Sequence, residues 1–306
     1  MLRLGTRGSV LARWQADWTA VALRRLGYEV EIVFVKTSGD TIQDGPITNI
    51  GAPGVFTKEI QRALLDGQVD IAVHSLKDLP TEHVDGLTLG AVPPRGPYRD
   101  VFVSQIAPTL GELPDGFVIG TGSLRRKSQI LYNFGNRFRI EDIRGNVETR
   151  LRKLDAGQVD SLVLAEAGLV RLGFSDRIAS FLEPPEFLPA VGQGALGIEI
   201  RSDDTVTATA VEPLNDPATF AVVLAERAFL RTLQGGCIAP IAALGTVAEN
   251  GLILQGRILS ADGTKMVQRT ITLADSPEHL GIRLAEVLLQ DGADEIMEQF
   301  RLQRGR

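Results

Sequence analysis

Small residues and hydroxyl groups precede a pair of arginines where a strand signal gives way to a helix signal. The segment reads Gly120-Thr121-Gly122-Ser123-Leu124-Arg125-Arg126. The first turn of a helix presents unpaired N–H groups and the positive end of its dipole, and small residues let an anion approach them. With two guanidinium groups added, the segment predicts a pocket for a carboxylate or a phosphate. The alternative is an ordinary helix cap followed by two solvated arginines.

Two further turns repeat this combination of residues. Arg144 and Gly145 lead into a helix signal that carries Arg150, and Arg7 and Ser9 stand at the start of the first helix signal. A guanidinium group matches carboxylate or phosphate oxygens two at a time. Three such turns predict a ligand with several anionic groups, either several carboxylates or a polyphosphate.

A cluster of polar residues, His74-Ser75-Leu76-Lys77-Asp78, follows a short apolar run. This is the carboxyl end of a predicted strand, where α/β sheets place their ligands. No nucleophile elbow accompanies the Ser–His pair, so hydrolase chemistry is not indicated. Asp78, a carboxylate among basic residues, can donate a proton to a leaving group and stabilise a developing cation. The alternatives are a structural cap before Pro80 for Asp78 and a hydrogen-bonded place in the core for His74.

The single cysteine, Cys237, follows Gly235 and Gly236. A lone cysteine is most often a small buried hydrophobe. Two glycines favour an unhindered loop in which a thiolate can be alkylated, so Cys237 is a candidate for covalent attachment. No Cys or His stands at metal-ligand spacing from it, so no metal site is expected. One cysteine excludes an internal disulfide and favours the cytoplasm.

The composition limits the class of partner. The 306 residues carry a net charge of −6, which disfavours nucleic acid, and no apolar run is long enough to span a membrane. The first residues also lack the apolar stretch of a signal peptide. Arginine outnumbers lysine 26 to 6, and eight of the arginines lie between Arg125 and Arg171. An arginine-rich genome explains part of this bias, but not the positions of the arginines at the predicted turns.

Strand and helix signals alternate through the first two thirds of the sequence, which is typical of an α/β protein. Strand signals cover residues 28–35, 70–74, 117–119, 138–142, 161–165 and 195–201, and helix signals cover 124–134 and 146–156. Proline-containing segments at 93–97 and 187–191 are typical of crossings between lobes. The predicted fold has two periplasmic-binding-protein-like lobes with mixed sheets, joined by a hinge, with the ligand in the cleft.

A third, smaller α+β domain is predicted after residue 212. Asp216 can cap a helix with Pro217 at its first position, and strand signals follow at 241–247, 252–259 and 266–273, with a hairpin turn at 261–263 and a helix at 277–289. The predicted division is therefore 1–94 with 195–212 for the first lobe, 95–194 for the second and 213–306 for the third domain.

Along essentially its whole length, the chain resembles the porphobilinogen deaminase (hydroxymethylbilane synthase) family. The matching segments are Thr6-Arg7-Gly8-Ser9 with Leu11-Ala12 and Gln15-Ala16, then 74–80, 120–126, 144–147 with Thr149-Arg150, 188–195, and Gly235-Gly236-Cys237. Six such segments in the same order are a specific signature.

The resemblance implies a transferase that carries a dipyrromethane cofactor on Cys237. Four molecules of porphobilinogen lose ammonia in turn and join head to tail onto this primer, and water then releases hydroxymethylbilane, a step of tetrapyrrole and haem biosynthesis. Each pyrrole carries an acetate and a propionate, which accounts for arginine-rich turns in an acidic protein. The resemblance also implies a cytoplasmic monomer that binds neither nucleic acid nor a membrane.

The same resemblance implies roles for individual residues, with Asp78 as the catalytic residue. The residues implied to bind the cofactor are Cys237, Ser9, Ser75, Lys77, Asp78, Thr121, Ser123, Arg125, Arg126, Arg144 and Gly145. The residues implied to bind the substrate are Arg7, Ser9, Phe56, Arg144, Arg150, Arg171 and Gln193.

One loop departs from the family pattern. Ala52-Pro53-Gly54 stands where the family usually has Gly-Lys-Gly, and Asn49 stands where some members have lysine. The charge that this loop contributes is therefore in question, whereas Asp78 and Cys237 are intact. Two other interpretations remain open: a non-enzymatic two-lobed protein that binds a small anion, and an enzyme that has lost its activity. The Gly-Gly-Cys third domain argues against the first.

Overall fold

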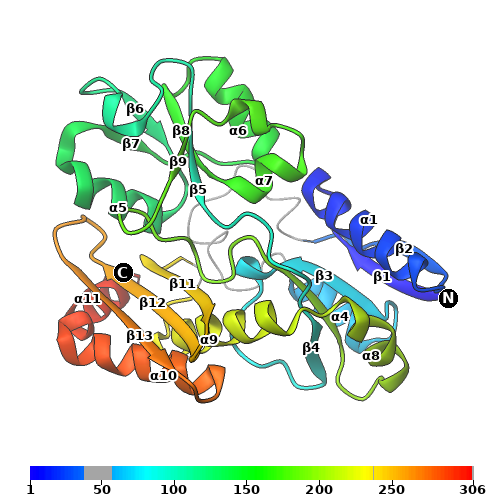
Figure 1. The fold of residues 1–306 in the computed structure, drawn as a ribbon. Coiled ribbons are helices and arrows are strands. Elements are labelled where there is room, and N and C mark those ends of the chain that lie inside the picture. Colours follow the sequence, from blue (N-terminus) through cyan, green and yellow to red (C-terminus); the bar gives the residue numbers. More distant parts are fainter. Residues whose placement is uncertain (38–56, 237, 305–306) are drawn as a thin grey trace. The chain divides into compact units, whose positions relative to one another are not determined.

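The computed structural model describes residues 1–37, 57–236 and 238–304, with the side chains up to residue 303 (Figure 1). The chain divides into two compact units. The first comprises Met1–Gly96 and Gly194–Ala221, and the second comprises Pro97–Gln193 and Val222–Arg306.

A five-stranded mixed sheet forms the centre of the first unit, in the order β2-β1-β3-β10-β4. β1 runs parallel to β2 and β3, and β10 runs antiparallel to β3 and β4. The elements are β1 (Leu2–Thr6), α1 (Val10–Arg25), β2 (Val30–Phe34), α4 (Lys58–Leu65), β3 (Ile71–Ser75), η1 (Leu76–Asp78), β4 (Leu87–Ala91), β10 (Leu196–Arg201) and α8 (Thr205–Val211).

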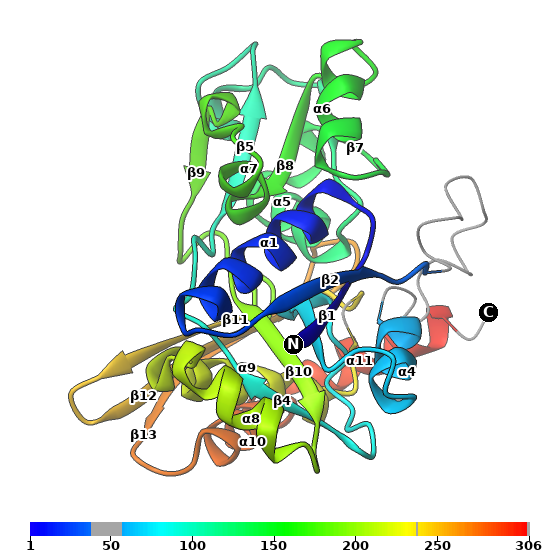
Figure 2. The same cartoon turned by 90° about the vertical axis from the view of Figure 1, so that its right-hand side faces the viewer.

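Helices cover both faces of this sheet (Figure 2). Because side chains alternate along a strand, Ile71 and Val73 of β3 point to one face and Ala72 to the other. The first face packs against α1 and α8, and the second packs against Ile60 and Leu64 of α4. The sheet is therefore buried on both sides, as expected for an α/β lobe.

The second unit contains a mixed sheet of the same kind, in the order β7-β6-β8-β5-β9. β6 runs parallel to β7 and β8, and β5 runs antiparallel to β8 and β9. One face packs against α6 and α7, and the other packs against α5. The elements are β5 (Asp100–Ser104), β6 (Val118–Gly120), α5 (Leu124–Phe134), β7 (Arg139–Glu141), α6 (Val147–Asp155), β8 (Ser161–Ala165), α7 (Glu166–Arg171) and β9 (Ser180–Leu182).

The second unit also holds a three-stranded antiparallel sheet, β11-β12-β13, with three helices packed on one face. Its core includes Phe229 of α9, Leu284 of α10 and Met297 of α11. The elements are α9 (Pro217–Leu233), β11 (Ile241–Ala248), β12 (Gly251–Leu259), β13 (Met266–Leu273), α10 (Pro277–Leu288) and α11 (Asp294–Arg304). Residues 217–221 of α9 belong to the first unit, and the rest of the helix belongs to the second. Asp216 caps α9 through the main-chain N–H of Thr219 at 2.6 Å, as predicted.

The two mixed sheets and the smaller antiparallel sheet confirm the predicted fold class. Several elements had no predicted counterpart, among them β4, β5 and α8. The predicted three-domain boundaries remain a prediction. Among the described residues, no helix combines the length and the apolar character needed to cross a membrane.

The contact between α9 and α10 requires a glycine. A Cβ built on Gly281 would lie 2.2 Å from the main-chain oxygen of Ala225 and 2.7 Å from the nitrogen of Phe229. We expect Gly281→Ala to lower the free energy of unfolding by about 1–3 kcal/mol, because the helices must move apart. This loss outweighs the gain of about 1 kcal/mol in helix propensity.

Urea denaturation monitored by circular dichroism measures the effect of Gly281→Ala. Gly111→Ala is the matched control, since a Cβ there meets no atom within 4 Å. Equal stabilities of the two variants would show that α10 does not depend on this close approach.

Candidate functional site

The predicted anion-binding turns follow parallel strands at the carboxyl edges of both mixed sheets. In the second unit, β6 leads to the turn before α5, and its parallel neighbour β7 leads to the turn before α6. The two turns are in contact, because a Cβ on Gly122 would lie 3.0 Å from both Asp142 Oδ1 and Ile143 O. This edge is where open α/β sheets bind ligands.

A polar side chain caps each of the three helices that start at these turns. Ser9 caps α1 and Ser123 caps α5, each accepting a hydrogen bond from the main-chain N–H three residues later (3.4 and 3.5 Å). Asn146 caps α6 in the same way at 2.8 Å. The predicted helix starts are confirmed. Because each serine oxygen accepts a bond here, its hydroxyl hydrogen is still able to donate to an anion.

Arg125 and Arg126 are buried rather than solvated, at 4% and 5% exposure. Both bind Asp100, which is 1% exposed: Arg125 Nη1 lies 2.5 Å from Asp100 Oδ2, and Arg126 Nε lies 2.9 Å from Asp100 Oδ1. The alternative of two surface arginines is therefore wrong. Arg125 also donates to the main-chain oxygen of Leu188 at 2.6 Å, and Arg126 donates to that of Val163 at 3.1 Å.

This buried ion cluster, Asp100 with Arg125 and Arg126, contains two positive charges and one negative charge. Burial alone raises the pKa of Asp100, but the two guanidinium charges outweigh it and hold the pKa below its ordinary value. Burial lowers the pKa of Arg126, and the charge of Asp100 opposes this effect. The excess positive charge favours an additional anion nearby.

Gln193, a predicted substrate ligand, is 1% exposed and belongs to the surroundings of this cluster. Its Nε2 donates to Asp100 Oδ1 at 2.9 Å and to the main-chain oxygen of Tyr98 at 2.8 Å. Asp100 itself was not predicted. It follows the proline segment at 93–97, and no local pattern marks the first residue of a strand as the counter-ion of arginines 25 residues away.

The remaining predicted ligands of the second unit lie along the same turns or near them. Arg144 Nε lies 3.1 Å from Asp142 Oδ2, and Arg150 Nε donates to the main-chain oxygen of Gly145 at 2.8 Å. Thr121 is buried and accepts a hydrogen bond from the Ser123 N–H at 3.3 Å. Arg171 is the last residue of α7, and burial lowers its pKa to about 10.

In the first unit, four predicted site residues surround one pocket. Arg7, Ser9, Ser75 and Asp78 line it, and Asp78 is the one carboxylate among its described lining residues. β1 and β3 are parallel neighbours, so the turns that follow them come together at one edge. Gln15, for which no role was predicted, donates to Ser75 Oγ at 2.6 Å and lines the same pocket.

His74 has the structural role that was the alternative for it. It is 5% exposed, and its Nε2 lies 3.1 Å from Oε2 of the buried Glu199 on β10. Gln61 of α4 donates to the other oxygen of Glu199 at 2.9 Å. These bonds join β3, β10 and α4 beneath the pocket. Lys77 is half buried in the short turn η1 that also contains Asp78.

Two predicted site residues, Cys237 and Phe56, lie outside the described residues. The same is true of Asn49 and of the segment 52–54, where the sequence departs from the family pattern. Their roles remain predictions.

Comparison with family models matches nearly the whole chain. Residues 2–209 match the model described as "Porphobilinogen deaminase, dipyromethane cofactor binding domain", and residues 220–290 match "Porphobilinogen deaminase, C-terminal domain".

Curated relatives carry the same name. A porphobilinogen deaminase of Geobacter sulfurreducens is 47% identical over 302 residues, covering 97% of this chain and 94% of the relative. That of Syntrophotalea carbinolica is 46% identical over 299 residues, covering 97% and 95%. Among solved structures, a nutrient binding protein from Burkholderia cenocepacia bound to methionine is 12% identical, with a TM-score of 0.45, covering 76% of this chain and 96% of that one.

The buried ion cluster predicts a pH-dependent stability. We expect Asp100→Asn to lower the free energy of unfolding at pH 7 by about 3–5 kcal/mol, because it leaves two buried guanidinium groups without a counter-ion. The folded pKa of Asp100 is depressed, so its contribution is complete above the unfolded pKa of about 3.9 and declines as the pH falls toward the folded pKa. The difference in the free energy of unfolding between Asp100→Asn and the wild type should therefore shrink below about pH 4.

Urea unfolding at pH 7 and at lower pH tests this expectation. Asp115→Asn is the control, since Asp115 pairs with Arg137 at the surface, where its side chain is 81% exposed. The control should change the stability by less than about 1 kcal/mol. Similar losses for both variants would contradict a special role of the buried cluster.

Proposed function

The chain belongs to the porphobilinogen deaminase family, and on this premise we propose the roles of its individual residues. The enzyme joins four porphobilinogen molecules head to tail with loss of ammonia and releases hydroxymethylbilane by hydrolysis. It uses a dipyrromethane cofactor attached through the single cysteine of the chain, Cys237.

Asp78 is proposed as the catalytic residue. The observation that carries this proposal is its place as the one carboxylate among the described residues of a pocket that also contains Arg7 and Ser9. As the amine leaves porphobilinogen, positive charge develops on the pyrrole ring, and a fixed carboxylate stabilises that charge. When it is protonated, the same carboxyl group can donate a proton to the departing amine, and the carboxylate that this leaves can accept a proton afterwards.

The residues present fit a cofactor that carries several carboxylates. The buried ion cluster has one guanidinium charge in excess, and the hydroxyl groups of Ser9 and Ser123 are able to donate beyond their capping bonds. The residues proposed to hold the cofactor are Ser9, Ser75, Lys77, Asp78, Thr121, Ser123, Arg125, Arg126, Arg144 and Gly145, with Cys237 as its anchor. When bound, the dipyrromethane supplies the free pyrrole position to which the first substrate is joined.

Substrate carboxylates are proposed to bind a partly separate set of residues. These are Arg7, Ser9, Phe56, Arg144, Arg150, Arg171 and Gln193. Arginine suits this task because its planar fork binds both oxygens of a carboxylate and stays charged at neutral pH. For Gln193 the bond to Asp100 favours an indirect contribution, since this glutamine orients the carboxylate that holds Arg125 and Arg126.

We also propose that the enzyme is a monomer of the cytoplasm that binds neither nucleic acid nor a membrane. The family membership and the net charge of −6 support this proposal.

Removal of the Asp78 charge tests the proposed catalytic role. We expect Asp78→Asn to reduce the turnover of porphobilinogen by about 10²-fold or more, because the developing cation loses its counter-charge. Asp78 is exposed, so the melting temperature should change little. Formation of linear tetrapyrrole from porphobilinogen measures the turnover.

Asp85→Asn is the matched control for this variant. Like Asp78, Asp85 lies in the segment that precedes β4, and its side chain is fully solvated. The control should retain wild-type turnover. Near-normal product formation by Asp78→Asn would remove Asp78 from the mechanism.

Replacement of the anchor tests the covalent attachment separately. Cys237→Ser should give a folded, inactive protein whose intact mass is that of the bare chain, because no other thiol is present. Wild-type protein produced with porphobilinogen available should be heavier by the mass of the cofactor and should react with a pyrrole-specific aldehyde reagent. A wild-type mass equal to that of the bare chain would rule out Cys237 as the anchor.

A further inference from the structure

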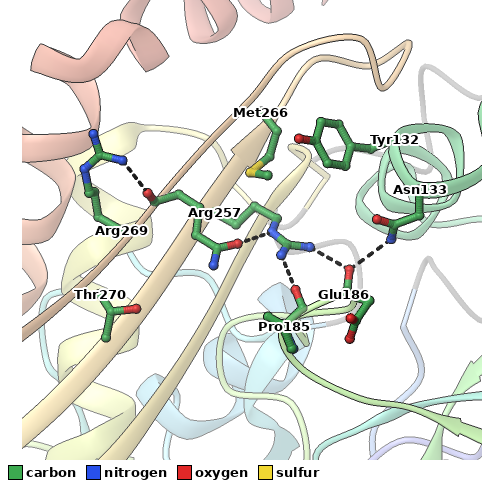
Figure 3. Close-up of a pocket in the computed structure, with 9 residues that line it drawn as sticks. Tyr132, Asn133, Pro185, Glu186, Arg257, Met266, Arg269 and Thr270 are labelled. Carbon is green, nitrogen blue, oxygen red and sulfur yellow. Dashed lines mark hydrogen bonds between the residues drawn. The ribbon is translucent and has the colours of Figure 1, made fainter.

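A second pocket lies within the second unit, lined by α5, the loop before Phe187 and the small antiparallel sheet (Figure 3). Its volume is about 490 Å³. This volume lies within the range of roughly 300–1,000 Å³ that is usual for ligand pockets, although the pocket is a depression largely open to solvent rather than an enclosed cavity. None of the residues assigned to the cofactor or the substrate lines it.

Arg257 of β12 forms part of the pocket wall although it is 4% exposed. Its guanidinium group donates to the side-chain oxygens of Gln268 (2.7 Å) and Gln129 (2.9 Å). It also donates to the main-chain oxygens of Glu186 (2.7 Å) and Pro185. Figure 3 shows Arg257 between the loop that contains Pro185 and Glu186 and the strand that carries Met266 and Thr270.

All four of these acceptors are neutral, so they satisfy hydrogen bonds without balancing the charge. In the part of the chain that the structure describes, Arg257 has no carboxylate within ion-pair distance. Four of the five N–H groups of a guanidinium are thus used, and the fifth, on Nη2, has no acceptor among these residues. Burial lowers the pKa of Arg257, and electrostatic interactions with Tyr132 and Glu186 oppose this effect without outweighing it.

This arrangement differs from that of Arg125 and Arg126, where a buried carboxylate balances one of the two charges. Glu186 also lines the pocket, but its side chain is exposed to solvent and forms no ion pair with Arg257. A buried charge without a directly paired counter-ion is unfavourable, and an anion beside it offsets this cost. Around Arg257, the ring of Tyr132, the ring of Pro185 and the thioether of Met266 provide apolar surface. Thr270 adds a hydroxyl group to the wall.

We propose that this pocket is a binding site for a small organic anion, a carboxylate on a flat apolar ring, with its carboxylate beside Arg257 and its ring against Tyr132 and Met266. Arg269 at the pocket adds positive potential, although it is paired with Asp291 at 2.8 Å. The site is separate from the catalytic function and does not depend on the proposed roles of Asp78 or Cys237.

The chain carries a reporter for this site. It has three methionines: Met266 lines the pocket, Met297 lies in the core of the same unit, and Met1 is exposed. Protein labelled with ¹³C at the methionine methyl groups therefore gives three NMR signals. The signal that is absent from the Met266→Leu variant is that of Met266. Benzoate is the probe, and benzamide is its neutral counterpart of the same shape.

We expect benzoate to shift the Met266 signal in a saturable way, with a Kd of about 1 mM or tighter, while Met297 and Met1 stay in place. Benzamide should cause a much smaller shift, because it lacks the charge. Arg269→Glu should weaken benzoate binding roughly fivefold or more, since it reverses a charge at the pocket. Arg257 itself is left unchanged, because its hydrogen bonds support the fold.

Arg283→Glu is the matched control. Arg283 lies in the same unit, its side chain is as exposed as that of Arg269 (51% each), and it also pairs with a carboxylate, that of Glu286. This variant should bind benzoate like the wild type. The proposal is overturned if benzoate leaves Met266 unshifted, if benzamide binds equally well, if Met297 shifts along with Met266, or if Arg269→Glu binds benzoate with wild-type affinity.

Discussion

One buried ion cluster fixes the start of α5 against the mixed sheet of the second unit. Asp100 begins β5, and Arg125 and Arg126 lie in the first turn of α5. Taking such groups out of water costs several kcal/mol per ion, and only short, well-oriented contacts offset this. Besides the contacts with Asp100, Arg125 donates to the main-chain oxygen of Leu188 and Arg126 to that of Val163. These two hydrogen bonds connect α5 to the crossing segment at 187–191 and to β8. The predicted anion-binding turn at 120–126 therefore keeps its shape because Asp100 and two main-chain oxygens already bind Arg125 and Arg126.

The same network continues from the cluster into the small antiparallel sheet. Gln193 binds Asp100, and its neighbour Gly192 donates its N–H to the buried Glu226 of α9 at 2.6 Å. Glu226 also accepts from the main-chain N–H of Gly245 in β11 at 2.9 Å. The segment before β10 is therefore held by the cluster on one side and by α9 on the other. This connection explains why the second mixed sheet and the antiparallel sheet form one compact unit.

Sequence patterns predicted the features that depend on near neighbours. The helices after Ser123 and Asp216 were predicted because a cap and an apolar period act within a few residues, and α5 spans the predicted 124–134. Buried polar partners were missed, because Asp100 and Glu226 show their role only when distant segments meet. Gly263 combines a predicted feature with a missed one. The hairpin turn at this glycine was predicted from the local sequence. Its close approach to α5, where an added Cβ would lie 2.5 Å from Cβ of Leu131, is a contact that no local pattern reveals.

An acidic protein can bind an acidic ligand because net charge and local charge act over different distances. The chain carries six more negative than positive charges, but most of its carboxylates lie in water, where salt screens them beyond about 8–10 Å. The guanidinium groups of Arg125, Arg126 and Arg257 are buried, so water and salt screen them far less. A carboxylate that approaches within a few ångströms therefore experiences the nearby arginines more strongly than the surface charge. Burial, which lowers the pKa of Arg126, also leaves its charge less screened by water.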